Sequence, residues 1–391
     1  MSAALLAGIA SAAYVGKMPP ALPAFQQALD LSLVAVSWLV SIFNLIGLTA
    51  ALLFGLAADR VGAYRFCLAG LAALAAGGVL GSLADSAAGL LASRVLEGAG
   101  FTAVTVSAPA LLAAASAAAD RNLTLELWGG YLPAGAAATL ALAPVALAAI
   151  GWRGMWLAIA ALTGACAAWL ASRAAGYAGV TAGRTRSLTD VRQALGQPVP
   201  WLFGCAFGVY TLSFTAVTVW LPTYLQQTQS ASLARGALLT AAAVVANLLG
   251  NLYGSRLAHR DVARGRTIMA AFALGAVAAV GIFGAALPAA ARYGSALLFN
   301  LIIGVIPPAV MSGVPRYART PADVSALQGL LVQLGNLGTF VAPPLVAWAV
   351  SAAGRWEAAL AVLVAAAAIG AVLGAAIARF ERSRPRPAAA R

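Results

Sequence analysis

The stretch GLAADRVGAYR, from Gly55 to Arg65, is a short charged interruption between two long apolar runs. The runs cover residues 32–57 and 65–84. Each is long enough to cross a hydrocarbon core of about 30 Å, because an α-helix rises about 1.5 Å per residue. Gly62 lies inside the interruption, where a residue without a Cβ allows a tight turn. The stretch therefore predicts two membrane-spanning helices joined by a short turn.

The same pattern extends over the whole chain of 391 residues, of which 62% are hydrophobic and only 9% are charged. Soluble domains carry roughly 25% charged residues, so we expect an integral membrane protein. The apolar runs lack the alternation of barrel strands. We expect an all-α membrane protein with twelve transmembrane helices, at residues 3–27, 32–57, 65–84, 87–116, 124–149, 154–173, 200–225, 233–257, 267–289, 293–315, 323–350 and 357–379.

The net charge of +13 follows this topology rather than a nucleic-acid surface. With the N-terminus inside, eighteen arginines fall in cytoplasmic loops and the tail, and four fall on the opposite side. This is the positive-inside bias of membrane proteins, so we expect both termini in the cytoplasm and no nucleic-acid partner. No basic segment precedes the first apolar run, which we interpret as a span rather than a cleaved signal.

A polar segment, residues 175–198, separates six apolar runs from six. We expect a six-helix bundle at 1–175, a cytoplasmic linker at 176–199, a second six-helix bundle at 200–380 and a basic cytoplasmic tail at 381–391. Two such bundles are a transporter design, with the substrate site between them near the bilayer midplane. The two halves share residues at an offset of about 200, including Gly129 and Gly329, Gly135 and Gly335, Thr139 and Thr339, Pro144 and Pro344, Gly154 and Gly354, and Trp156 and Trp356.

Three motifs carry a family resemblance. GLAADRVGAYR resembles the signature between the second and third spans of the major facilitator superfamily. SRVLEGAG, from Ser93, resembles the fourth-span motif of that family, and GWRGMW, from Gly151, is common between its fifth and sixth spans. The resemblance implies two pseudo-symmetric six-helix bundles in a major facilitator fold that transports by alternating access.

The signature between the second and third spans also indicates a gate. Asp59 can pair with basic groups and face a helix end, which would make a latch with Arg60 and Arg65. The chain departs from the family pattern because only Arg65 remains of a basic pair. In the second half, His259 stands at the acidic position.

A finer resemblance rests on KMPPALP from Lys17, RVLEGAGF from Arg94 and LWGGYLPAG from Leu127. These stretches are similar to bacterial permeases of the cyanate and nitroimidazole transporter subfamily. Members of that subfamily tend to carry a basic residue followed by prolines in the first span. The resemblance implies no single substrate, because the members differ.

Lys17 is the only lysine in the chain and lies about 21 Å into the expected first span. Prolines remove helical donors, so Pro19, Pro20 and Pro23 should break the helix beside it. Irregular backbone at this depth lines a cavity or is buried in protein. The ammonium can therefore meet an anionic solute in a cavity, or it can extend to the outer headgroups along its flexible stem.

Arg94 and Glu97 are three residues apart, so they share one face of the expected fourth helix. Glu97 is the one acidic residue clearly inside a span. One interpretation is proton coupling through a carboxyl group that responds to burial and to Arg94. The other is a permanent structural ion pair, with Arg94 also a candidate anion contact.

Further candidates are polar or aromatic residues inside the expected spans. Aromatic rings can close a pocket and orient a ligand, whereas amides can also simply bridge helices. Prolines interrupt the spans that hold several of these candidates. Together with Lys17 and Arg94, the substrate-binding set is Tyr14, Trp128, Tyr131, Tyr210, Trp220, Gln333 and Asn336.

No catalytic or metal-binding constellation emerges from the sequence. The chain has three unpaired cysteines and one histidine, and it lacks a glycine-rich phosphate loop with lysine. We therefore expect no enzyme activity, no cofactor and no ATP-driven pumping. A membrane-embedded sensor is disfavoured because the sequence contains no soluble signalling domain.

These observations favour a secondary active transporter of a small solute, with a small anion as the leading candidate and protons as a candidate coupling ion. The alternative is an efflux antiporter for drug-like or hydrophobic compounds. Such antiporters usually carry Gly-Pro in the fifth span, where this chain has Leu132 before Pro133. We expect a monomer in the lipid bilayer of the bacterial inner membrane.

Overall fold

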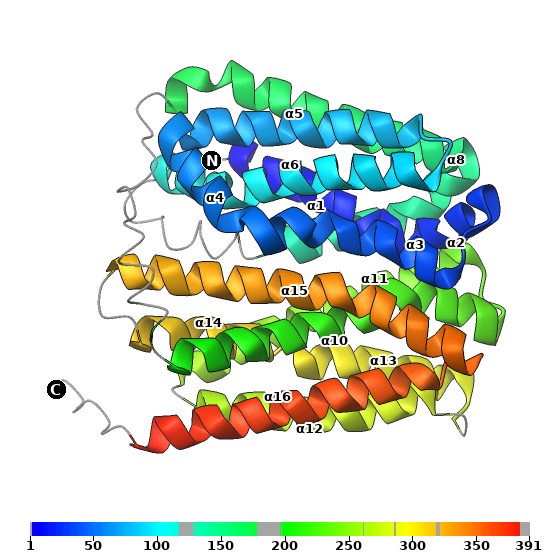
Figure 1. The fold of residues 1–391 in the computed structure, drawn as a ribbon, viewed down its shortest axis with the longest axis vertical. Helices are drawn as coiled ribbons and strands as arrows, with labels where there is room; N and C mark the ends of the chain where they lie inside the picture. Colours follow the sequence, from blue (N-terminus) through cyan, green and yellow to red (C-terminus); the bar gives the residue numbers. More distant parts are fainter. Residues whose placement is uncertain are drawn as a thin grey trace. The chain divides into compact units, whose positions relative to one another are not determined.

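The computed structural model describes residues 2–116, 128, 130–177, 196, 198–260, 262–284, 287–317 and 321–383, with the backbone alone for residues 52, 314–317 and 321–326. These residues form α-helices and short 3-10 segments and contain no strand, as Figure 1 shows. The all-helical prediction is confirmed for this part of the chain.

Contacts divide the chain into two units. Unit 1 comprises Met1–Arg186, Thr215–Val245 and Thr339–Arg355, and unit 2 comprises Ser187–Phe214, Ala246–Gly338 and Trp356–Arg391. Three long helices thus contribute residues to both units. The bundle boundaries expected from the sequence, 1–175 and 200–380, remain a prediction.

The first half of the chain forms the helices of unit 1 that hold most of the motifs. Within it, α5 packs against α6, and α1 packs against α8. The elements are α1 (Ser2–Gly16), α2 (Met18–Leu29), α3 (Leu33–Ser41), η1 (Ile42–Asn44), α4 (Leu45–Val61), α5 (Ala63–Ser82), α6 (Ala87–Ala114), α8 (Tyr131–Ser172) and η2 (Ala174–Tyr177).

The second half contains seven helices in the described residues. In unit 2, α12 and α16 run side by side (Figure 1). The elements are α10 (Pro198–Gln229), α11 (Leu233–His259), α12 (Arg264–Phe283), α13 (Ala289–Ile303), α14 (Ile306–Tyr317), α15 (Pro321–Ala353) and α16 (Ala358–Ser383).

Ten segments of the described chain are long and apolar enough to cross a membrane, compared with the twelve expected from the sequence, and two features bear on this difference. Helix α8 has 42 residues, about twice the length of one span, and Gly151 interrupts it with non-helical φ 65° and ψ 177°. The first apolar run is divided into α1 and α2, which have 15 and 12 residues. Twelve spans therefore remain a prediction that these breaks leave open.

Turn geometry supports the internal repeat. Asp30 and Ser230 have φ of 47° and 50°, and each follows the first expected span of its half. Two residues later, the Oγ of Ser32 accepts a hydrogen bond from the N–H of Ala35 at 3.1 Å. The Oγ of Ser232 accepts one from the N–H of Arg235 at 3.2 Å. A residue with positive φ, followed two positions later by a serine that accepts a backbone hydrogen bond, thus occurs at the same place in both halves, 200 residues apart, which extends the sequence pairing to the backbone.

The repeat also corrects one pairing made from the sequence. Gly354 has φ 65°, and the glycine with the same φ in the first half is Gly151. Gly154, which the sequence pairs with Gly354, lies inside the following helix. Glycine adopts a positive φ without strain, and both Gly151 and Gly354 do so at a turn between helices. The residue equivalent to Gly354 is therefore Gly151 and not Gly154.

The GLAADRVGAYR turn forms as the sequence predicts. Gly62, with φ 95°, separates α4 from α5. Arg60 and Arg65 are exposed, and Asp59 is half-buried. Tyr64, at a position where the family has a basic residue, stacks on Tyr177 with ring centroids 5.8 Å apart. An aromatic contact therefore holds this turn against the segment that follows α8, at a position where the family pattern has a charged residue.

Candidate functional site

The break between α1 and α2 positions Lys17. Its N–H still bonds to the carbonyl of Ala13 at 2.9 Å, but Pro19 and Pro20 provide no N–H for the carbonyls of Val15 and Gly16. Lys17 is the residue between the two helices, and its side chain is fully buried. The broken helix expected from the proline run is confirmed.

Helix α6 carries the partners of Lys17. Glu97 lies about 15 Å along the helix from Ala87, at which α6 begins. Its Oε1 is 2.8 Å from the Lys17 Nζ, and its Oε2 accepts a hydrogen bond from the Arg94 Nη1. One carboxylate is thus held by two cations, and we call Lys17, Arg94 and Glu97 the charge cluster.

Backbone carbonyls fix the guanidinium of Arg94. Its Nε donates to the carbonyl of Leu39 at 3.0 Å, and its Nη1 donates to the carbonyl of Tyr14 at 3.3 Å. Leu39 belongs to α3 and Tyr14 to α1. Arg94 therefore connects three helices of unit 1 and cannot leave the cluster without breaking these bonds.

Aromatic rings surround both cations. The Lys17 Nζ lies 4.1 Å from the ring centroid of Tyr14 and 4.1 Å from that of Trp156. The Arg94 Cζ lies 4.3 Å from the ring centroid of Phe43. Because a desolvated cation–π contact contributes about 2 kcal/mol or more, these rings offset part of the cost of burying charge.

The cluster carries a net positive charge when all three groups are ionised. The side chains of Lys17 and Glu97 are 0% exposed and that of Arg94 is 2% exposed. Ionisable groups buried in a membrane protein are costly and mark substrate or proton pathways, and a buried ion pair is weak evidence of a stabilising role. Because two cations share one carboxylate, they can bind an anionic ligand when that carboxylate is neutral.

Three glycines of α5 make room for this arrangement. A Cβ at Gly77 would lie 2.7 Å from the Glu97 Cγ, and one at Gly81 would lie 2.8 Å from the Trp156 Cδ1. At Gly78 it would lie 3.1 Å from the Tyr14 hydroxyl. The glycine face of α5 therefore allows the carboxylate and both rings to approach Lys17.

The structure places Lys17 in neither orientation expected from the sequence. Its ammonium faces Glu97, so it neither lines an open cavity nor extends to headgroups. The Arg94–Glu97 pair is confirmed. Sequence reasoning missed Trp156 and Phe43 as partners. The available signal was that the only lysine and the one clearly intramembrane acid both needed a counter-charge.

The other candidates in unit 1 lie outside the charge cluster. Trp128 and Tyr131 stack on each other with ring centroids 4.1 Å apart and cover Gly8 of α1. The Trp220 Nε1 donates to the carbonyl of Pro343 at 3.2 Å. These contacts are helix packing in this conformation, and their roles in binding remain predictions.

Unit 2 holds a separate, neutral polar cluster. The Tyr210 hydroxyl donates to the Asn247 Oδ1 at 3.0 Å, and the Asn251 Nδ2 donates to the same oxygen at 3.1 Å. The Asn247 Nδ2 donates to the carbonyl of Asn300 at 3.1 Å. We call these four residues the amide cluster.

The last two candidates are in α15. Gln333 is half-buried. Asn336 is also half-buried, and its Nδ2 donates to the carbonyl of Val332 in the same helix at 2.9 Å. The structure thus joins Tyr14, Lys17, Arg94 and Glu97 in one site, and it gives each of the remaining candidates its own local contacts.

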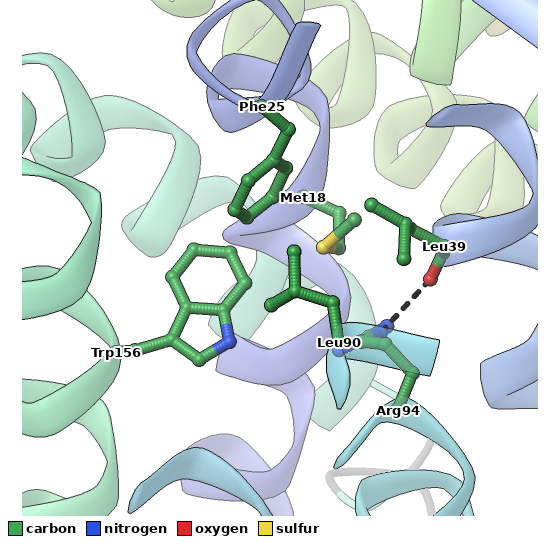
Figure 2. Close-up of a pocket in the computed structure, with 6 residues that line it drawn as sticks. All are labelled: Met18, Phe25, Leu39, Leu90, Arg94 and Trp156. Atoms are coloured by element: carbon green, nitrogen blue, oxygen red, sulfur yellow. Dashed lines mark hydrogen bonds between the residues drawn. The ribbon is translucent and has the colours of Figure 1, made fainter. Parts of the chain in front are cut away.

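A small pocket adjoins the charge cluster, as Figure 2 shows. Its lining is Met18, Phe25, Leu39, Leu90, Arg94 and Trp156, and it has no room for a water molecule. The Leu39 carbonyl bonded to Arg94 is at its edge (Figure 2). Apolar side chains therefore cover one side of the buried charges.

Solved structures share this fold. A bacterial homolog of the human lysosomal transporter Spinster, inward-facing and occupied, superposes with a TM-score of 0.81 at 14% identity, over 99% of this chain and 97% of that chain. The inward-facing unoccupied form gives 0.81 and 14% over 99% of each chain. At this identity the likeness shows the fold.

Sequence comparison identifies the family. The inner membrane transport protein YajR of Escherichia coli (strain K12) is 33% identical over 123 residues, which are 30% of this chain and 27% of that protein. The match thus spans about a quarter of that relative's length. The Major Facilitator Superfamily signature matches residues 2–337. The chain therefore belongs to the major facilitator superfamily and is a multi-pass membrane transporter, not an enzyme.

Proposed function

We propose that this transporter moves a small anion together with a proton by alternating access. The observation that carries the proposal is the single carboxylate of Glu97 held between Lys17 and Arg94 in a fully buried cluster. Two cations that share one acid form a receptor for a carboxylate-sized anion whenever that acid loses its charge.

Charge balance suggests how the two solutes are coupled. With Glu97 ionised, the cluster holds two positive charges and one negative charge. Protonation of Glu97 leaves Lys17 and Arg94 without a counter-charge, and a bound monoanion restores it. The loaded cluster, with one proton and one anion, has the same net charge as the empty cluster. Transport of a monoanion would therefore be electroneutral, with the proton on the Glu97 carboxyl group.

The substrate class, the side of the termini, the cellular location and the oligomeric state are part of the same proposal. Lys17 followed by prolines is similar to the cyanate and nitroimidazole permease subfamily, which supports a small anionic or nitroaromatic substrate. The arginine distribution supports cytoplasmic termini. The relative from Escherichia coli is an inner membrane protein, which supports a bacterial inner membrane location. We propose a monomer as the working unit.

The test begins with a thermal-shift screen of the purified protein against small carboxylates, cyanate and nitroaromatics. Compounds that stabilise the protein are then followed as uptake into proteoliposomes under an imposed pH gradient. Lys17→Ala should abolish uptake, because Arg94 alone cannot replace both contacts to the anion. Lys17→Arg should retain part of it. Arg235→Ala, which removes an exposed cation, is the matched control.

Parental uptake by both Lys17 variants would exclude the anion role. Uptake that changes when a potassium gradient with valinomycin sets the membrane potential would contradict one-to-one coupling. If no anion binds and cells lacking the protein become sensitive to drug-like compounds, export of hydrophobic compounds is the better description.

A further inference from the structure

Five apolar side chains lie between the charge cluster and one end of unit 1. We call this end distal, because α2 turns toward α3 there and Gly151 divides α8 there. Arg153 joins the α5–α6 turn to the same end by bonds of 2.9 Å to the carbonyls of Ser82 and Ala84. The arginine distribution assigns this end to the outside.

The five side chains are Met18 and Phe25 from α2, Leu39 from α3, Leu90 from α6 and Trp156 from α8. Each is at most 1% exposed. Figure 2 shows them converging on the pocket beside Arg94, which cannot hold water. We call this set the distal seal.

Position along each helix places the seal on the distal side of the charges. Leu90 is one turn closer than Arg94 to the start of α6. Trp156 follows shortly after Gly151, and its ring covers the Lys17 ammonium. Phe25 packs edge-on against Trp156 at 5.2 Å and against Trp152 at 5.0 Å. The apolar layer therefore continues from the charges toward the distal turn.

We propose that the distal seal keeps water and protons of the distal side away from Glu97. Protons cross a protein along hydrogen-bonded groups and waters, and an apolar layer with no room for water interrupts such a chain. The proposal rests on the proposed function, in which Glu97 carries the coupled proton. Coupling requires this carboxyl group to meet one side of the membrane at a time, and the seal supplies the closed side.

Leu90→Ala tests the proposal, because removing three carbons opens space for a water molecule beside Arg94. Proteoliposomes with an imposed pH gradient and no added anion should then show proton flux above the parental level. Leu157→Ala is the matched control, since Leu157 follows Trp156 but is 45% exposed. It should leave the proton flux unchanged. Leu39→Ala provides a second opening if Leu90→Ala does not fold.

A double variant identifies the route. In Leu90→Ala/Glu97→Gln the extra proton flux should be lost, because the amide cannot relay a proton. A flux that persists in the double variant, or a parental flux in both opened variants, would overturn the proposal. The assay contains no anion, so failure to find a transported anion does not affect it. If the opened variants take up an anion but keep the parental proton flux, the role of the distal seal is wrong and the proposed function still stands.

Discussion

The stretches GKMPPAL, from Gly16 to Leu22, and GVIPPAV, from Gly304 to Val310, share a glycine, a proline pair and an alanine at the same spacing. Each divides an apolar run into two helices. The first separates α1 from α2 at Lys17, and the second separates α13 from α14 at Gly304 and Val305. In both, the prolines deprive two preceding carbonyls of their helical donors.

The side chains at the two breaks are different in character. Lys17 stands one residue after the glycine at the first break and pairs with Glu97. Val305 stands at the same place in the second. Asn300 lies one turn before the second break, and this buried residue belongs to the neutral amide cluster. A broken helix alone is therefore not an ion site; it becomes one where the facing helix supplies an acid.

The largest effect should come from Glu97→Gln, because it leaves Lys17 and Arg94 buried without a negative partner. Breaking a buried ion pair in this way costs about 3–5 kcal/mol. Thermal unfolding in detergent should show a large loss of stability. Adding Lys17→Met should recover part of it by removing one of the two uncompensated charges. Parental stability in Glu97→Gln would mean that the charge cluster is not neutralised by Glu97.

Val305→Lys should have an intermediate effect on stability. It places a lysine directly after the glycine, as at the first break, but without an acidic residue on the facing helix. Helix α11 approaches Val305 at Gly254, and its sequence contains no acidic residue. A lysine at the centre of a membrane helix costs about 2.5–3.5 kcal/mol on insertion scales, and the cost at Val305 should be smaller because this residue is half-buried at a break between helices. The loss of thermal stability should exceed that of Val305→Met, which tests side-chain size without charge. Equal stability of the two variants would show that the second break accommodates a cation unaided.

Tyr210→Phe should have the smallest effect. It removes the hydroxyl that donates to Asn247, a neutral hydrogen bond with a net contribution of about 0.5–1.5 kcal/mol. Proton-coupled uptake should persist, because the charge cluster is intact. Phe214, which stacks on Tyr210, offers a control as Phe214→Leu for loss of ring packing alone. Loss of coupling in Tyr210→Phe would place the amide cluster in the proton route.

The helices were predictable because their signals are local. Apolar runs of membrane-spanning length match the observed helices, and Gly62 makes the expected turn. The expected separation of the fifth and sixth runs is also local, since the non-helical backbone of Gly151 divides α8 between them. The repeat was predictable from shared residues, but its alignment at Gly151 required the φ angles.

The sequence by itself determined the membrane helices, the break at Lys17 and the Arg94–Glu97 pair, because each depends on residues within a turn or two of one another. Only the tertiary structure decided that Lys17 meets Glu97, which lies 80 residues away. That contact depends on how α1 and α6 pack, and on the space left by Gly77 and Gly81 of α5. Helical periodicity specifies which residues share a face, whereas the pairing of two faces follows from how closely the helices can approach.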